Sequence, residues 1–134
     1  MATLTARLEP WLEQDIRSLS EVLGEGPSAT LRRVVEEWWT LEHFPLLEFR
    51  DGVTGRRAGI RGGPDVWEVM LIATDFTGEQ HAKLDALTEH FGGFISHEAL
   101  IQAFEYAERF PQDIAQRLRN NARVEQLLQK PTRR

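Results

Sequence analysis

The sequence contains no cysteine, so disulfides, thiolate nucleophiles and cysteine zinc sites are excluded, and a reducing compartment is favoured. It also lacks long apolar runs, since none approaches the roughly 20 residues that span a bilayer. The first residues, Met-Ala-Thr-Leu-Thr-Ala-Arg, provide no basic stretch leading into an apolar segment. We therefore expect no secretory signal, no membrane association and a cytoplasmic location.

Recognisable catalytic spacings are missing as well. There is no Gly-x-Ser-x-Gly elbow and no phosphate-binding Gly-x-x-x-x-Gly-Lys. Asp51 and Asp65 could in principle pair as acid and base, but nothing in their spacing distinguishes them from ordinary turn residues. The chain has four histidines: His43, His81, His90 and His97. They form neither an i, i+4 pair nor a His-Glu-x-x-His motif. The sequence thus predicts a protein that is not an enzyme and that needs no metal or cofactor.

What is present suits one domain or two small ones: 134 residues, 41% hydrophobic and 28% charged. The net charge of −5 argues against indiscriminate binding to polyanions, because that requires clustered positive charge. Residues 1–43 carry 4 arginines and 8 acids, and the remainder carries 12 basic residues and 13 acids. We divide the chain into a domain over 1–43, a second over 44–129 and a basic tail over 130–134.

The first domain starts with a segment in which apolar residues recur at every second position. Leu4, Ala6 and Leu8 alternate with polar residues, which predicts a strand with one buried face. Pro10 begins a helix, Gly24-Glu-Gly26-Pro27 ends it, and Ser28 is the expected N-cap of a second helix that reaches His43. One face of that helix is apolar (Leu31, Val34, Val35, Trp38, Trp39) and the other is charged (Arg32, Arg33, Glu36, Glu37). A lone strand is unstable in water, so we predict that it pairs with the same strand of a second copy.

Strand, helix, glycine turn and helix over residues 2–41 resemble the ribbon-helix-helix family of repressors and antitoxins. The resemblance implies a homodimer, or a higher even oligomer, whose two-stranded ribbon enters the major groove of operator DNA. By position, the residues that would face the bases are Thr3, Thr5 and Arg7. The family's phosphate contact at the start of its second helix would fall on the amides of Ser28 and Ala29.

The second domain is predicted to hold a short Gly-rich and Arg-rich hairpin within 46–63, followed by helices over about 65–75, 78–91, 96–110 and 112–129. Residues 49–63, Phe-Arg-Asp-Gly-Val-Thr-Gly-Arg-Arg-Ala-Gly-Ile-Arg-Gly-Gly, resemble the domain of unknown function 433 family. The run Ser96-His-Glu-Ala-Leu-Ile-Gln-Ala-Phe-Glu-Tyr-Ala-Glu does so too. Gly63-Pro64 stands where that family usually has Thr-Arg, and the segment between Ala73 and Ser96 is longer than usual.

This second resemblance implies a hairpin followed by a homeodomain-like helix-turn-helix bundle, and an antitoxin role beside a PIN-like ribonuclease toxin. The chain as a whole is then mainly α. The helix in the recognition position is expected to expose His97, Glu98, Gln102, Glu105, Glu108 and Arg109. That face is acidic and phosphate would be repelled by it, so we expect protein contact or scaffolding there instead of DNA binding.

Two clusters of arginine have two interpretations each. Arg50, Arg56, Arg57 and Arg61 could contact an acidic partner, or they could balance nearby acids in a solvated hairpin. The basic segment from Arg117 to Arg134, with Arg119 and Arg123, is amphipathic only through Val124, Leu127 and Leu128. It could fold on a partner or be a frayed terminal helix.

These observations favour an antitoxin-like transcriptional regulator that reads an operator through its N-terminal ribbon and binds a toxin through its C-terminal region. The alternative is a protein-interaction or assembly module that uses the N-terminal strand only to dimerise and does not bind DNA. The acidic balance of residues 1–43 favours this alternative.

Overall fold

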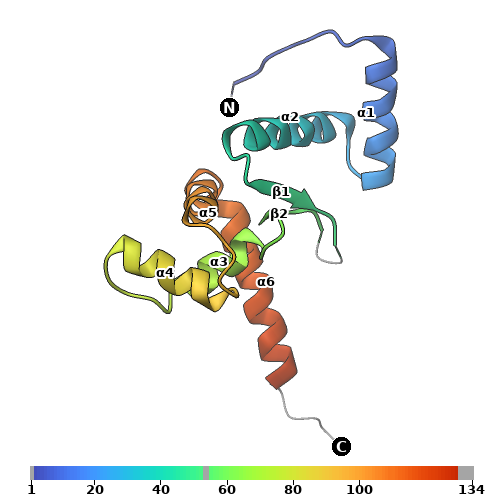
Figure 1. Cartoon of the computed structure of the whole chain (residues 1–134). Coiled ribbons are helices and arrows are strands. Elements are labelled where there is room, and N and C mark those ends of the chain that lie inside the picture. Colours follow the sequence, from blue (N-terminus) through green and yellow to red (C-terminus); the bar gives the residue numbers. More distant parts are fainter. Residues whose placement is uncertain (1, 53–54, 130–134) are drawn as a thin grey trace, which may run out of the picture. The chain divides into compact units, whose positions relative to one another are not determined.

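The computed structural model describes residues 2–52 and 55–129. The fold is mainly helical and includes a small antiparallel sheet of two strands. Figure 1 shows the order of the elements: α1 (Pro10–Leu23), α2 (Pro27–His43), β1 (Leu47–Arg50), β2 (Arg57–Ile60), α3 (Val66–Ala73), α4 (Gln80–His90), α5 (His97–Arg109) and α6 (Pro111–Gln129). The chain divides into two compact units, Met1–Thr40 and Leu41–Arg134, close to the boundary after His43 that the sequence suggests. The proposed tail over 130–134 lies outside the described residues, as do Val53 and Thr54 of the predicted hairpin.

Local sequence signals set the ends of the two N-terminal helices. Pro10 occupies the first turn of α1, and Gly24 ends it in the left-handed conformation at φ 68°. The predicted N-cap role of Ser28 is wrong, because α2 begins at Pro27 and Ser28 lies within its first turn. The first intrahelical bond of α2 runs from the Thr30 N–H to the carbonyl of Gly26 at 3.0 Å, so the helix begins two residues earlier than predicted.

Residues 2–9 form neither a helix nor a strand in the single chain, and residues 2–7 are exposed. The predicted strand over this segment is therefore not present in an isolated copy. The physical reason is that a strand needs a hydrogen-bonded neighbour, and β1 and β2 pair with each other instead.

The α2 helix leaves most of its large apolar side chains exposed. Its buried residues are Thr30 and Thr40, while the aliphatic and aromatic stripe stays at the surface. Leu31, Val34, Val35 and Trp38 are 38%, 37%, 53% and 60% exposed. The N-terminal unit consequently buries little apolar surface by itself.

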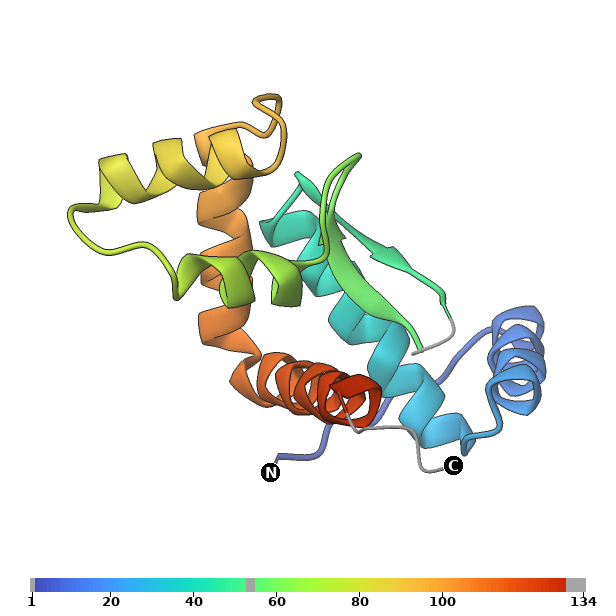
Figure 2. The ribbon, with the colours of Figure 1, turned by 90° about the horizontal axis from the view of Figure 1, so that it is seen from below.

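The C-terminal unit has the larger core, and α5 lies at its centre. This helix packs against β1, β2, α3, α4 and α6. Figure 2 shows α3 and α4 crossing α5, and α6 leading away from its end. The fully buried side chains include Leu47, Val66, Val69, Leu87 and Leu100, which come from β1, α3, α4 and α5.

The hairpin places Leu47 opposite Ile60, Glu48 opposite Gly59, Phe49 opposite Ala58 and Arg50 opposite Arg57. Over residues 2–52 and 55–129, no helix combines the length and the apolar content needed to cross a bilayer.

Candidate functional site

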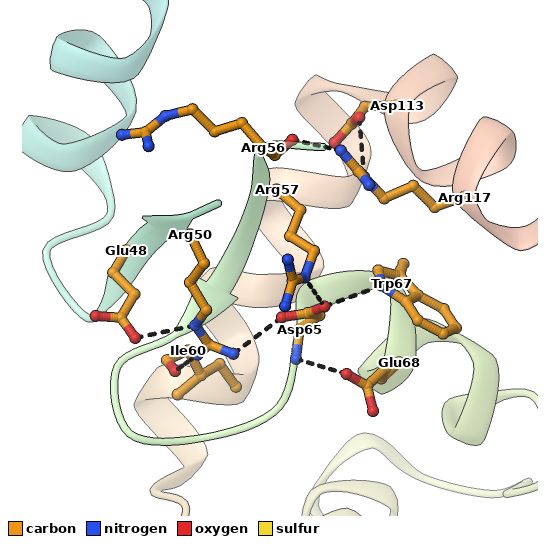
Figure 3. A network of polar contacts seen from close by, with 10 residues as sticks. All are labelled: Glu48, Arg50, Arg56, Arg57, Ile60, Asp65, Trp67, Glu68, Asp113 and Arg117. Atoms are coloured by element: carbon orange, nitrogen blue, oxygen red, sulfur yellow. Dashed lines mark hydrogen bonds and ion pairs between the residues drawn. The ribbon is translucent and has the colours of Figure 1, made fainter. Parts of the chain in front are cut away.

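Asp65 is a buried carboxylate at the junction of the hairpin and α3, only 4% exposed. Its Oδ1 accepts a hydrogen bond from Nη1 of Arg50 at 2.9 Å. Its Oδ2 accepts from Nε of Arg57, and also from the indole N–H of Trp67 at 3.2 Å. The backbone N–H of Asp65 donates to the Glu68 carboxylate at 3.2 Å, which completes the capping box of α3. Figure 3 shows the two arginines converging on the carboxylate, which therefore ties both strands to the next helix.

Gly59 makes room for this arrangement. A Cβ at that position would lie 2.5 Å from Cζ of Arg50, so a side chain there would displace the guanidinium. Arg50 also donates to the carbonyl of Ile60, and its Nε lies 3.0 Å from the carboxylate of Glu48. Arg50 and Arg57 were predicted to bind a partner protein, but both guanidiniums already bond to groups within their own unit. Holding the hairpin to α3 is therefore an alternative role for them.

The other two hairpin arginines lie nearer the surface. Nη1 of Arg56 is 3.2 Å from the exposed carboxylate of Asp51, and its Cζ is 5.9 Å from the centroid of the Phe49 ring. Figure 3 shows Arg56 pointing away from the buried carboxylate. Arg61 is exposed, and its Nε donates to the carbonyl of Pro45 at 2.9 Å. The four arginines therefore do not form one cationic cluster.

A second network of polar contacts holds α6 to the rest of the unit. The hydroxyl of Tyr106 donates to Asp113 at 3.1 Å, and Nε of Arg117 lies 3.5 Å from the other oxygen of that carboxylate. Arg117 also donates to the backbone carbonyl of Arg56 (Figure 3). The ring of Phe49 meets the ring of Tyr106 edge to face at 6.4 Å. These contacts fix the first half of α6 against the hairpin.

The residues predicted to read DNA are all accessible. Thr3, Thr5 and Arg7 are exposed in the irregular segment 2–9. Ser28 and Ala29 are exposed in the first turn of α2, where backbone N–H groups have no carbonyl partner within the helix. Such amides suit an anion, as the ribbon-helix-helix resemblance requires.

Contacts within the N-terminal unit show how its two helices meet. A hollow of about 150 Å³ is lined by residues that include Leu8, Ile16, Pro27 and Leu31. Leu8 is half-buried there, whereas Leu4 is 96% exposed. The apolar face of the N-terminal segment is thus only partly covered in a single copy.

Glu25, in the turn between α1 and α2, forms a two-pronged ion pair with Arg33. Nε and Nη2 of Arg33 donate to the two carboxylate oxygens at 2.9 and 3.1 Å. The hydroxyl of Thr30 donates to the same carboxylate at 3.3 Å. The hydrogen bonds from Arg33, above all, lower the pKa of Glu25 below its ordinary value of 4.5.

Two histidines that are far apart in the sequence meet at the start of α4 and α5. Nε2 of His97 lies 2.8 Å from one oxygen of Asp85, and Nε2 of His81 lies 3.5 Å from the other. Their rings are 5.2 Å apart, edge to face. Across the described ranges, no three His, Asp or Glu side chains converge in a way that could hold a metal ion.

The sequence predicts one exposed face on α5, and only part of that face is exposed in the structure. Glu98, Glu105, Glu108 and Arg109 are exposed, and His97 is half-buried. The prediction for Gln102 is wrong: it is buried, because its Oε1 accepts a hydrogen bond from the backbone N–H of Leu46 at 2.8 Å.

The far end of α6 carries the remaining predicted partner residues. Arg119 donates to Gln116 at 2.9 Å, and Arg123 is exposed one turn later. A hollow of about 220 Å³ is lined by other residues of this helix and by Trp67, namely Trp67, Arg117, Asn120, Asn121 and Val124.

The sequence reasoning missed Asp65 and Trp67. Neither has a local pattern that separates it from a turn residue or a core aromatic. The one available signal is the Asp65-x-x-Glu68 spacing, which is typical of a capping box at a helix start. Comparison of the chain with models of known protein families, with curated proteins and with solved structures finds no significant match.

Proposed function

We propose that this chain is an antitoxin-like transcriptional regulator. Two copies associate through their N-terminal units, and residues 2–9 of each copy form one strand of a ribbon that reads operator DNA. The C-terminal unit binds a protein toxin, of which a PIN-like ribonuclease is the type that the resemblance implies. The proposal assigns no catalytic step to this chain.

The observation that carries the proposal is the exposed apolar stripe of α2. Four large apolar side chains at helical spacing are exposed, while Thr30 and Thr40 are the buried residues of the same helix. Burying an aliphatic or aromatic side chain stabilises by about 1.5–3 kcal/mol relative to leaving it exposed. A second copy supplies a matching apolar face and, for the segment containing Leu4, a neighbouring strand.

Operator reading is supported by the accessibility of Thr3, Thr5 and Arg7 and by the resemblance. In a paired ribbon these alternate residues share one face, and the leucines share the other. Arginine can bind guanine through O6 and N7, and threonine can contact any base or a thymine methyl. Ser28 and Ala29 would then orient the dimer on phosphate.

The test selects duplexes from a random pool with the full-length protein and measures their affinity by mobility shift at several salt concentrations. Arg7→Ala should weaken the selected duplex by about 1–3 kcal/mol and relax the preference at one base pair. Arg17→Ala is the matched control, because Arg17 is an exposed arginine of α1 paired with Glu13 at 3.1 Å. Unchanged binding by Arg7→Ala, or an equal loss for both variants, refutes operator reading by the ribbon.

A second candidate function is an assembly module that dimerises without binding DNA. It is favoured by the charge of residues 1–43, where 8 acids outnumber 4 arginines. This candidate predicts a dimer in solution for which no duplex is enriched from the pool. It also predicts no salt-dependent DNA affinity, whereas the regulator should lose affinity steeply as salt rises.

A further inference from the structure

Three helices of the C-terminal unit surround a hollow of about 520 Å³. Each helix contributes residues from one face: Met70 and Ala73 from α3, Lys83 from α4, and Phe104, Ala107 and Glu108 from α5. Figure 2 shows α3 and α4 crossing α5, which is the arrangement that leaves this space. Sites for small molecules have volumes of about 300–1,000 Å³, so the hollow is large enough for a ligand.

The floor of the hollow is apolar. Ala73 and Ala107 are 3% and 8% exposed, and Met70 and Phe104 are half-buried. The two alanines come from helices that pack against each other, and their short side chains leave space between those helices. The unbranched thioether of Met70 can adjust to an occupant. An apolar ligand would remove this floor from water, which is favourable.

The charged residues of the lining differ in their exposure. Lys83 is half-buried, and its ammonium group has no ion pair or hydrogen bond within residues 2–52 and 55–129. Glu108 and the amide of Gln80 are exposed, so water solvates them and weakens the repulsion between Glu108 and an anion. A partly buried ammonium gains more from a carboxylate than from a neutral acceptor, because charge-assisted hydrogen bonds are about twice as strong. The hollow therefore favours an anionic group next to Lys83.

These two properties together select one class of ligand. A small inorganic anion would pair with Lys83 and leave the apolar floor in water. A neutral hydrocarbon would cover the floor and leave the ammonium unpaired. A second copy of the chain is not needed to complete the hollow, because all of its lining residues belong to one unit.

We propose that the hollow between α3, α4 and α5 binds a small apolar carboxylic acid. Its carboxylate accepts hydrogen bonds from the ammonium group of Lys83, and its hydrocarbon body packs on Met70, Ala73, Phe104 and Ala107. This binding site does not depend on the proposed function, since it involves neither residues 2–9 nor the stripe of α2.

The test titrates the full-length, isotope-labelled protein with octanoate and follows the methyl signals of Met70, Ala73 and Ala107. We expect saturable shift changes at these methyl groups. Hexanoate lacks two of the methylenes and should bind about fifteenfold more weakly, because each buried methylene raises affinity about fourfold. Octanol and octylammonium have the same hydrocarbon body without the carboxylate, and they should bind at least about tenfold more weakly.

Variants assign the two halves of the site. Lys83→Gln should weaken octanoate at least about tenfold, which is the loss expected for a hydrogen bond to a charged group. Arg119→Gln is its matched control, because it removes a cation from an exposed position of the same unit and should leave the affinity unchanged. Ala107→Leu fills the hollow and should abolish the shift changes while circular dichroism shows an intact fold. Ala122→Leu makes the same change at an exposed position of α6 and should have no effect.

The proposal is overturned if octanoate causes no saturable change at the three methyl groups, or shifts the α2 stripe instead. It is also overturned if octanol or octylammonium binds as tightly as octanoate, or if hexanoate does. Equal losses for Lys83→Gln and Arg119→Gln refute the pairing with Lys83. Unchanged binding by a folded Ala107→Leu variant refutes the location, and if that variant does not fold, the Lys83 and Arg119 pair decides alone.

Discussion

Replacing Asp65 by asparagine probes a buried carboxylate that accepts several hydrogen bonds. The carboxylate accepts from two guanidiniums and an indole N–H while only 4% of the residue is exposed. Asparagine has nearly the same shape, but it carries no charge and turns one acceptor oxygen into a donor. Its amide group would face either the Arg50 donor, or the Arg57 and Trp67 donors.

The expected loss follows from the exposure of the partners. Removing one member of a fully buried ion pair costs about 3–5 kcal/mol, and a hydrogen bond to a charged group contributes about 1.5–3 kcal/mol. The side chains of Arg50 and Arg57 are 24% and 23% exposed, so water compensates part of the loss. We therefore expect Asp65→Asn to lower the free energy of unfolding of the C-terminal unit by about 2–4 kcal/mol.

Hydrogen exchange of the α5 amides in native conditions measures this free energy for the C-terminal unit, because α5 packs against every other element of its core. Asp51→Asn is the matched control: it changes the same group in the same hairpin, but the Asp51 side chain is 78% exposed and pairs with Arg56 at 3.2 Å. An exposed pair contributes about 0–1 kcal/mol. A loss below about 0.5 kcal/mol for Asp65→Asn, or equal losses for both variants, contradicts the argument that burial and convergent bonding make Asp65 a structural hub.

Two further predictions concern the N-terminal unit. Trp38→Ser should shift the protein from dimer toward monomer in analytical ultracentrifugation, because this side chain is 60% exposed in one copy and is proposed to be buried by the second. Trp11→Ser is the control, since Trp11 is 65% exposed and lies outside the α2 stripe. A dimer that is unchanged by Trp38→Ser counts against the proposed interface. Glu25→Gln should lower the thermal midpoint at pH 7. The folded pKa of Glu25 lies below its ordinary 4.5, so its stabilisation is present above pH 4.5 and is lost as pH falls through the folded value. The midpoints of variant and parent should therefore converge in acid, and a constant difference down to acid pH would contradict the role given to Arg33.

Local signals in the sequence account for most of the secondary structure. Pro10, the Gly24–Pro27 break and Pro111 each mark a helix boundary that the structure confirms to within a residue or two. The hairpin within 46–63 is also confirmed, because its two short strands flank turn-forming residues. These features depend on neighbours a few residues away, which is the range over which sequence patterns are informative.

The buried hydrogen bonds of the site join residues that are distant in the sequence, so local sequence patterns do not predict them. Asp65 lies 15 residues from Arg50 and 8 from Arg57 in sequence, and only the fold makes the three converge. Gln102 looks like a surface residue by polarity, yet it satisfies the backbone of Leu46, 56 residues away. A polar residue can occupy a core position when a buried backbone group needs a partner, and periodicity alone does not show where that need arises.

The exposed apolar stripe of α2 has the properties that a symmetric interface requires. A symmetric dimer presents the same surface from both copies, so its interface must be complementary to itself. The stripe of α2 meets this condition, since exposed Arg32 and Glu36 flank it with both signs of charge, and each can face the other across a two-fold axis. The hydrophobic effect is thus expected to join two copies through α2.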